Sequence, residues 1–163
     1  MSARNSDGIT PLFLAVDCKS PIELVAYLMD HGASPNARAL DGSTPLHWVA
    51  LFDFELSLMV AALSGSHDTV DKAAESISCS IKYRKKALLL IEHGADVNAK
   101  DNSGRTPLCE AVSAGKENLV QFFLEHGADV NAKDNHGKTA LTIAIENKDI
   151  DMVELLKKHG ARK

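Results

Sequence analysis

The sequence is poor in aromatic residues and has no excess of basic charge. Phe, Trp and Tyr make up 5% of its 163 residues, and 18 basic residues face 22 acidic ones, which gives a net charge of −4. Binding to nucleic acid needs cations that neutralise phosphates and, for single strands, aromatic rings on which bases stack. We therefore expect no nucleic-acid partner.

Cysteines are also few, and no long apolar run is free of charge. Cys18, Cys79 and Cys109 form no pair with the spacing of zinc ligands. The most apolar stretch, residues 46–63, carries two carboxylates near its middle, which disfavours a membrane span, and the first residues lack a secretory signal. We expect an intracellular, cytoplasmic protein with reduced thiols, no membrane span, no metal and no cofactor.

Two short motifs recur in phase along the chain. His-Gly-Ala occurs four times, starting at His31, His93, His126 and His159. A Thr-led tripeptide precedes each copy, starting at Thr10, Thr44, Thr106 and Thr139. The last three copies of His-Gly-Ala are 33 residues apart and the first two are 62 apart. A unit of 33 residues is therefore present four times, and the second unit carries about 28 extra residues.

The residue types around these motifs fit two helices in each unit. Thr caps a helix start and Pro is tolerated in its first turn, as at Thr106-Pro107. Residues 119–124 form an apolar stripe with helical spacing, and the glycine of His-Gly-Ala suits the left-handed residue that ends a helix. The histidine beside it favours the helix dipole, and repeats space these histidines apart, so they do not converge on a metal ion.

The period and the Thr-Pro-Leu motif, together with the segment 95–102 that recurs as 128–135, resemble the ankyrin-repeat family. The resemblance covers nearly the whole chain. It implies an all-α solenoid of stacked helix-turn-helix units with β-turn fingers, in a single domain over 1–163. The repeats span about 7–40, 41–100, 101–133 and 134–163. It also implies a scaffold that binds another protein and is not an enzyme.

Two departures from the family pattern stand out. The family's Thr-Pro-Leu-His histidine bonds to the neighbouring turn, and it is present here as His47 but replaced in the other units by Phe13, Cys109 and Thr142. The larger departure is the insertion of about 28 residues in the second repeat, roughly residues 54–81. Apolar residues keep helical spacing on both sides of a turn at 64–69, which predicts an extended helical hairpin with Ser66 or Asp68 as N-cap. A loop with a short separate helix is the alternative.

Family members bind proteins through the finger tips and the exposed face of the first helices. Positions of this kind vary between the copies in this chain, so we expect them to contact the partner. At the tips they are Leu40, Asp41, Ser43, Asn102, Ser103, Arg105, Asn135, His136 and Lys138. On the first helices they are Leu51, Phe52, Ser113, Glu146 and Asn147. Apolar residues in normally polar slots, such as Leu51, mark a partner site or a contact with the hairpin.

Other interpretations stay open. An enzyme would have its site in the insertion, around His67 and Cys79, although a lone Cys/His pair is a weak catalytic signal. The chain could instead be a host-directed effector, or the substrate of an asparaginyl hydroxylase at Asn98 and Asn131, whose surroundings match the family consensus.

Two further segments have two interpretations each. The basic run at 82–86 predicts a solvated helix face, with a patch for an anionic partner as the alternative. The last repeat lacks a polar cap, because Ile150, Met152 and Val153 are those of an internal repeat. The chain is then a fragment, or it self-associates through its uncapped ends.

Overall fold

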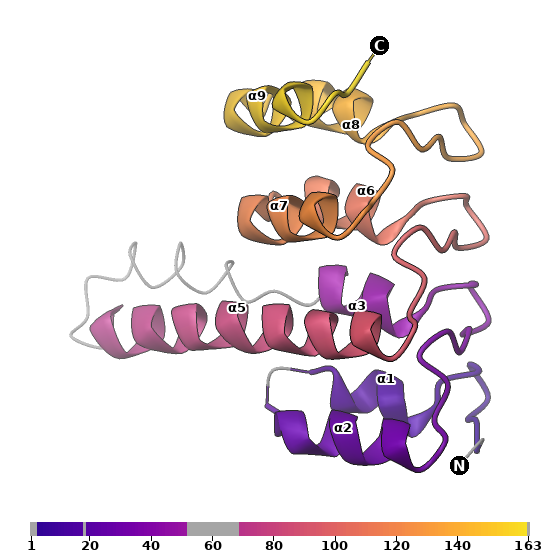
Figure 1. Cartoon of the computed structure of the whole chain (residues 1–163). Helices are drawn as coiled ribbons and strands as arrows, with labels where there is room; N and C mark the ends of the chain where they lie inside the picture. Colours follow the sequence, from indigo (N-terminus) through magenta and orange to yellow (C-terminus); the bar gives the residue numbers. More distant parts are fainter. Residues whose placement is uncertain (1–2, 18, 52–68, 163) are drawn as a thin grey trace.

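A computed structural model of the chain describes residues 3–17, 19–51 and 69–162, and of residues 69–80 the backbone alone. Within these ranges every regular element is a helix, and the helices form pairs stacked along one direction (Figure 1). The pairs are α1 (Pro11–Ala15) with α2 (Ile22–Asp30), α3 (Pro45–Leu51) with α5 (Thr69–Glu92), α6 (Pro107–Ser113) with α7 (Glu117–Glu125), and α8 (Ala140–Glu146) with α9 (Ile150–Lys158). Turn-rich fingers project on one side of the stack. The predicted all-α solenoid is thereby confirmed.

The Thr residues before the first helices cap them in the third and fourth repeats. The hydroxyl oxygens of Thr106 and Thr139 each accept a hydrogen bond, at 3.3 Å, from the backbone N–H three residues later. Thr10 makes no such bond, so its predicted side-chain cap is wrong. The amide of Phe13 instead donates to the carbonyl oxygen of Thr10 at 3.0 Å.

The His-Gly-Ala motifs end the second helices as expected. Gly94, Gly127 and Gly160 have φ values of 84°, 86° and 87°. The Nδ1 atoms of His31, His93 and His126 lie 2.7–2.8 Å from the carbonyl oxygen four residues earlier. Since a carbonyl only accepts, each Nδ1 donates, and the histidines help to satisfy the last turn of their helices.

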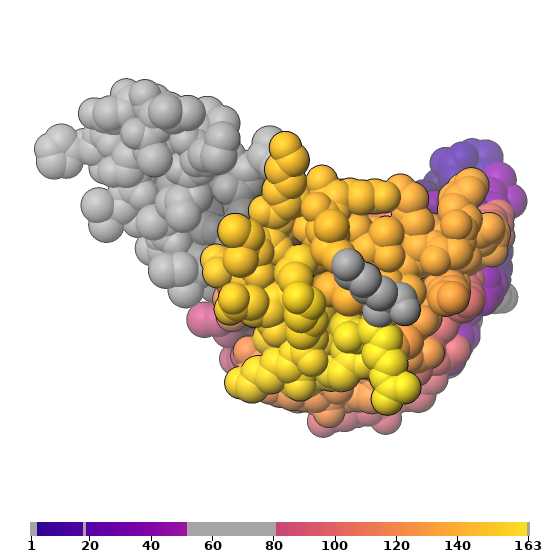
Figure 2. Space-filling model, turned by 90° about the horizontal axis from the view of Figure 1, so that it is seen from above, coloured from indigo at the N-terminus to yellow at the C-terminus, as the bar shows by residue number. Residues whose placement is uncertain are grey.

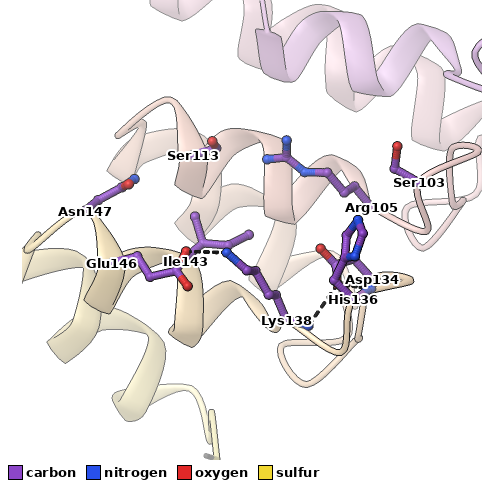
Figure 3. A pocket seen from close by; sticks show the side chains of 9 residues that line it. All are labelled: Ser103, Arg105, Ser113, Asp134, His136, Lys138, Ile143, Glu146 and Asn147. Carbon is purple, nitrogen blue, oxygen red and sulfur yellow. Dashed lines mark hydrogen bonds and ion pairs between the residues drawn. The ribbon is translucent and has the colours of Figure 1, made fainter.

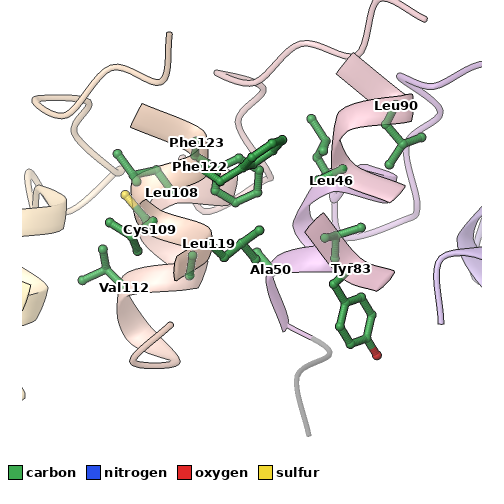
Figure 4. Close-up of a cluster of buried hydrophobic side chains, with 14 of the residues drawn as sticks. Leu46, Ala50, Tyr83, Leu90, Leu108, Cys109, Val112, Leu119, Phe122 and Phe123 are labelled. Carbon is green, nitrogen blue, oxygen red and sulfur yellow. The ribbon is translucent and has the colours of Figure 1, made fainter. Parts of the chain in front are cut away.

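The hydrophobic core runs between the pairs and needs neighbours on both sides. The first helices pack on one another in the order α1, α3, α6 and α8, while α2 packs on α5 and α7 on α9. Side chains from the four helices α3, α5, α6 and α7 of two adjacent repeats meet in the middle of the stack (Figure 4). They include Leu46, Tyr83, Leu90, Leu108, Val112, Leu119, Phe122 and Phe123. The predicted apolar stripe at 119–124 therefore faces the core.

The fingers are joined to each other through their backbones. Asn102 donates its backbone N–H to the carbonyl oxygen of Asp41 at 2.9 Å and its side-chain amide to that of Leu40 at 2.8 Å. Asn135 repeats both bonds to the finger before it, through Ser103 and Asn102, at 2.9 Å each. A Cβ atom on Gly42 would lie 2.7 Å from the Asn102 nitrogen, so the close stacking requires glycine there.

His47 connects the second repeat to the third, as the family resemblance implies. Its Nδ1 accepts the backbone N–H of Thr44 at 3.1 Å, and its Nε2 donates to the carbonyl oxygen of Arg105 at 3.0 Å. Burial lowers the pKa of His47 below the ordinary value of 6.5, although the bond to Arg105 acts to raise it. The neutral ring is the form that fits, because an imidazolium Nδ1–H could not accept from Thr44.

Two buried lysines, Lys86 in α5 and Lys116 at the N-terminal cap of α7, bond to the end of the first helix in the preceding repeat. The Nζ atom of Lys86 donates to the carbonyl oxygens of Ala15 at 2.9 Å and Ser20 at 2.8 Å, and also to that of Asp17. Lys116 donates to the carbonyl oxygen of Ala50 at 2.6 Å. Lys86 is 0% exposed, so the prediction that the whole run 82–86 is a solvated face is wrong at this residue.

The insertion lengthens the second helix of its repeat. Helix α5 has 24 residues, whereas α7 has 9, and the extra length lies at its N-terminal end, beyond the other helices (Figure 1). This extension is the second arm of the predicted hairpin, and α5 begins at Thr69, directly after the proposed cap Asp68. The first arm, Ser66 and Asp68 lie outside the described residues.

A lysine variant tests the buried cap. We expect Lys86→Met to lower the free energy of unfolding by about 2 kcal/mol, because three carbonyl groups lose their donor. Lys82→Met, which removes the same charge from an exposed position of α5, should change it by less than about 0.5 kcal/mol. Urea denaturation followed by circular dichroism measures both. Equal effects of the two variants would contradict the assigned role of Lys86.

The pH dependence of stability tests His47. His47 binds a proton near pH 6.5 in the unfolded state but only at a lower pH in the folded state, so protonation favours unfolding as the pH falls. Between about pH 7.5 and about pH 5.5 we expect the wild type to lose more stability than His47→Gln. The variant should be less stable at the higher pH, since glutamine replaces the two ring bonds imperfectly. His136→Gln, at an exposed histidine, is the control and should behave as the wild type.

Candidate partner-binding surface

Fingers and first helices of the third and fourth repeats enclose a hollow of about 360 Å³ (Figure 3). We call it the polar hollow. It is lined by Ser103, Arg105, Ser113, Asp134, His136, Lys138, Ile143, Glu146 and Asn147. Seven of these residues are among those predicted from the sequence to contact a partner, and Asp134 and Ile143 were not predicted.

The hollow carries charges of both signs. The Lys138 Nζ atom lies 2.7 Å from the Glu146 carboxylate, and both side chains are about half exposed. Asp134 holds the finger: its Oδ1 accepts the backbone N–H groups of Lys138 at 2.8 Å and His136 at 2.9 Å. Its slight burial acts to raise the pKa, but these two N–H groups outweigh it and hold the pKa of Asp134 below the ordinary value.

A second ion pair lies in the third repeat. The Arg105 Nε atom is 3.2 Å from Glu110, whose side chain is mostly buried. Burial raises the pKa of Glu110, although Arg105 opposes that shift. Arg105 thus favours the ionised form of the mostly buried Glu110. Lys138 and Glu146 both remain in contact with water, so each could leave the other and pair with a charged group of a ligand.

Several of the predicted tip residues are engaged within the solenoid. Ser43 is buried and accepts a hydrogen bond from Trp48 Nε1 at 3.2 Å. The Asp41 carboxylate accepts the backbone N–H of Ser43 at 2.9 Å; burial acts to raise the pKa of Asp41, but the bonds to Ser43 leave it lowered. Asn102 and Asn135 are exposed, but their side-chain amides join the fingers, as described above.

The equivalent surface of the first two repeats is apolar. Leu51 occupies the slot of Ser113 and Glu146 and is 51% exposed, and Leu40 at the finger tip is more exposed still. Leu14, which was not predicted, is also exposed. It lies four residues after Thr10, as Ile143 lies four after Thr139, and this spacing could have identified it. Phe52 lies outside the described residues.

The other interpretations find little geometry to support them. His67 lies outside the described residues, and of Cys79 only the backbone is described. Among the side chains that the structure describes, no three His, Cys, Asp or Glu residues gather as metal ligands. None of the described helices has the length and apolar character needed to cross a membrane. Asn98 and Asn131 are exposed, and their amides donate to the carbonyl oxygens of Gly127 and Gly160.

Comparison with known proteins identifies the repeats. A family model described as "Ankyrin repeats (3 copies)" matches residues 58–163, and one described as "Ankyrin repeats (many copies)" matches residues 12–56. The first match alone covers more than half of the chain.

Three curated relatives resemble this chain over part of their own length. The chain is 36% identical over 124 residues to the B-cell lymphoma 3 protein homolog of Mus musculus, covering 71% of this chain and 28% of that protein. It is 34% identical over 117 residues to the inactive serine/threonine-protein kinase TEX14 of Bos taurus, covering 72% and 6%. The ANK repeat-containing protein nipk-1 of Caenorhabditis elegans is 32% identical over 140 residues, covering 72% and 22%. The chain thus spans less than a third of each relative.

The two ion pairs should differ in their effect on stability. Replacing both Lys138 and Glu146 by Ala should change the free energy of unfolding by less than about 1 kcal/mol, because the pair is exposed. Arg105→Met should cost at least about 2 kcal/mol, because it leaves the buried Glu110 without its counter-ion. Thermal denaturation at neutral pH compares them. The reverse order would show that Lys138 and Glu146 serve the fold more than Arg105 does.

Proposed function

We propose, since this chain belongs to the ankyrin-repeat family, that it is a scaffold that binds a protein partner through the polar hollow and the apolar slots beside it. Ankyrin repeats are generally protein–protein interaction modules, and the family is typically non-enzymatic. The proposal assigns the partner contact to particular side chains of this chain.

The observation that carries the proposal is the convergence of seven variable positions on one hollow. These positions belong to two fingers and two first helices that are separated in the sequence. Their side chains face a common space in Figure 3, where Arg105 and Ser113 come from one repeat and Lys138, Glu146 and Asn147 from the next. Positions that differ between repeats and lie together on one accessible face are typical of a surface that recognises a specific partner.

The chemistry of this face changes along the stack, which restricts the kind of partner surface that can bind to it. Leu14, Leu40 and Leu51 make the first two repeats apolar, while Lys138 and Glu146 make the last repeat charged. A matching partner has apolar side chains opposite the first two repeats and a pair of opposite charges opposite the polar hollow. Buried apolar anchors would supply affinity, and the charges would fix the register.

Two further assignments belong to this proposal. The first is self-association, in which two copies of the chain meet at their C-terminal repeats. Ile145 and Ile150 support it, because both are exposed in the last repeat. In the third repeat the counterpart of Ile145 is Val112, which the next repeat covers. A cytoplasmic location agrees with the free, buried thiol of Cys109.

Charge substitutions on the face test the proposal. The full chain, its Leu51→Glu variant and its Glu146→Lys variant are used as baits, and quantitative mass spectrometry compares the proteins that each recovers. We expect at least one protein to be recovered by the wild type and to be reduced at least about tenfold with both variants, because both contact regions are needed.

The control is Glu154→Lys, which makes the same charge change on an exposed position of α9 away from the hollow. It should recover the same proteins as the wild type. Circular dichroism and urea denaturation must show all variants folded. Recovery that is unchanged in both Leu51→Glu and Glu146→Lys would overturn the site.

A further inference from the structure

A second hollow lies on the side of the second helices, at the seam between α5 and α7. It has a volume of about 370 Å³ and is lined by Ile81, Arg84, Lys85, Leu88, Phe122 and His126. None of these residues lines the polar hollow. We call it the seam groove.

The floor and wall of the seam groove are apolar. Ile81 is 52% exposed and Leu88 is 38% exposed, although both are large hydrophobic residues. They are seven residues apart on α5, so they lie on one face of the helix, with Lys85 between them. Phe122 forms the opposite side, with its ring 4.1 Å from that of His126.

The rim of the seam groove is basic. Arg84 lies over the Phe122 ring at 5.6 Å and is 3.8 Å from Glu125, a pair in which both side chains are largely exposed. Lys85 and the neighbouring Lys82 are exposed, and they form no ion pair with the described side chains. Because Lys86 is buried, the basic run contributes Arg84 and Lys85 to the lining of the groove, with the Glu125 carboxylate beside Arg84.

The neighbouring repeat shows that the fold does not require this composition. At a distance of 33 residues, the slots of Ile81, Arg84, Lys85 and Leu88 are filled in the third repeat by Ala114, Glu117, Asn118 and Gln121. All four are exposed. Ala114 lies at the C-terminal cap of α6, so only the lengthened α5 carries a helical residue at the position of Ile81. The insertion thus supplies Ile81, while Arg84, Lys85 and Leu88 distinguish α5 from α7 within the length that both helices share.

We propose that the seam groove binds an acidic amphipathic segment of a partner protein, with apolar side chains against Ile81, Leu88 and Phe122 and carboxylates beside Arg84 and Lys85. Charge complementarity selects this occupant, because Arg84 and Lys85 line an apolar hollow in a chain whose net charge is −4. A bilayer surface fits less well, since the apolar atoms lie in a hollow that a side chain can enter and a flat surface cannot. The site is separate from the face in the proposed function.

The neighbouring repeat supplies the test variant. In Lys85→Asn with Leu88→Gln, α5 receives the residues that α7 already carries at exposed positions, so the fold should be kept. A library of random peptides displayed on phage is first passed over this double variant, which removes peptides that bind elsewhere on the chain. The remaining peptides are selected for binding to the wild-type chain. We expect the recovered peptides to be acidic, with apolar residues at helical spacing.

The affinity of a synthetic copy of the most enriched peptide is then measured by fluorescence polarisation. We expect the double variant to bind it at least about tenfold more weakly than the wild type, and the wild-type affinity to fall as salt is raised. Lys157→Asn, which removes one charge from the last turn of α9, and Leu51→Glu should both leave the affinity unchanged. The peptide affinity does not depend on the partner recovered with the Leu51→Glu and Glu146→Lys baits, so a failure of that experiment would not change the result expected here.

Three results would overturn the inference. The first is a set of recovered peptides without an excess of acidic residues, and the second is equal binding of the peptide by the double variant. The third is binding to vesicles of phosphatidylserine and phosphatidylcholine that the double variant loses, together with no enriched peptide, which would make the seam a membrane contact.

Discussion

Each repeat of this solenoid depends on a neighbouring repeat to satisfy its own backbone. The finger carbonyls of Leu40 and Asp41 receive their donors from Asn102, and the carbonyl of Arg105 receives its donor from His47. The C-terminal carbonyls of α1 and α3 receive theirs from Lys86 and Lys116. An unpaired buried carbonyl costs about 1–3 kcal/mol, so no repeat is stable in this form without its neighbours. Gly42 is fixed by the same constraint, because a side chain there would separate the fingers.

This constraint also determines which positions are free to change. Side chains that point along the stack form the hydrogen bonds between repeats and the hydrophobic core, so the fold determines which residue types can stand there. Side chains that point across the stack, such as those of Lys138 and Glu146, make only exposed contacts. Substitution at such positions has little effect on stability, so the residue types found there can be selected for partner binding. The predicted site could therefore differ from repeat to repeat while the framework stayed the same.

The sequence predicts those parts of the fold that local patterns determine. The period of 33 residues, the glycines that end the second helices and the histidines beside them were all confirmed. Seven predicted contact residues meet in the polar hollow because equivalent positions of stacked repeats face the same way. Ser43 follows the same rule and is nevertheless buried, because Trp48 in its own repeat bonds to it.

The buried lysines show where the sequence does not suffice. Lys86 stands in a basic run, and its periodicity does not separate it from Lys85, yet one is buried and the other exposed. Its partners are carbonyl groups of a helix end about 70 residues earlier, which no local pattern relates to it. A long-range acceptor of this kind becomes visible only once the repeats are stacked.

The second repeat shows how an insertion can be added without loss of this network. It keeps His47 and Lys86 in their bonds to the neighbouring repeats and Tyr83 and Leu90 in the core, while the extra residues enter between α3 and α5. The lengthened helix then carries Ile81 beyond the edge that the other second helices reach. The apolar residues on this stretch are not required by the stack, since the third repeat does without them. Exposed apolar area that the stack does not need marks a place where a partner can bind, which favours a binding role for the seam groove.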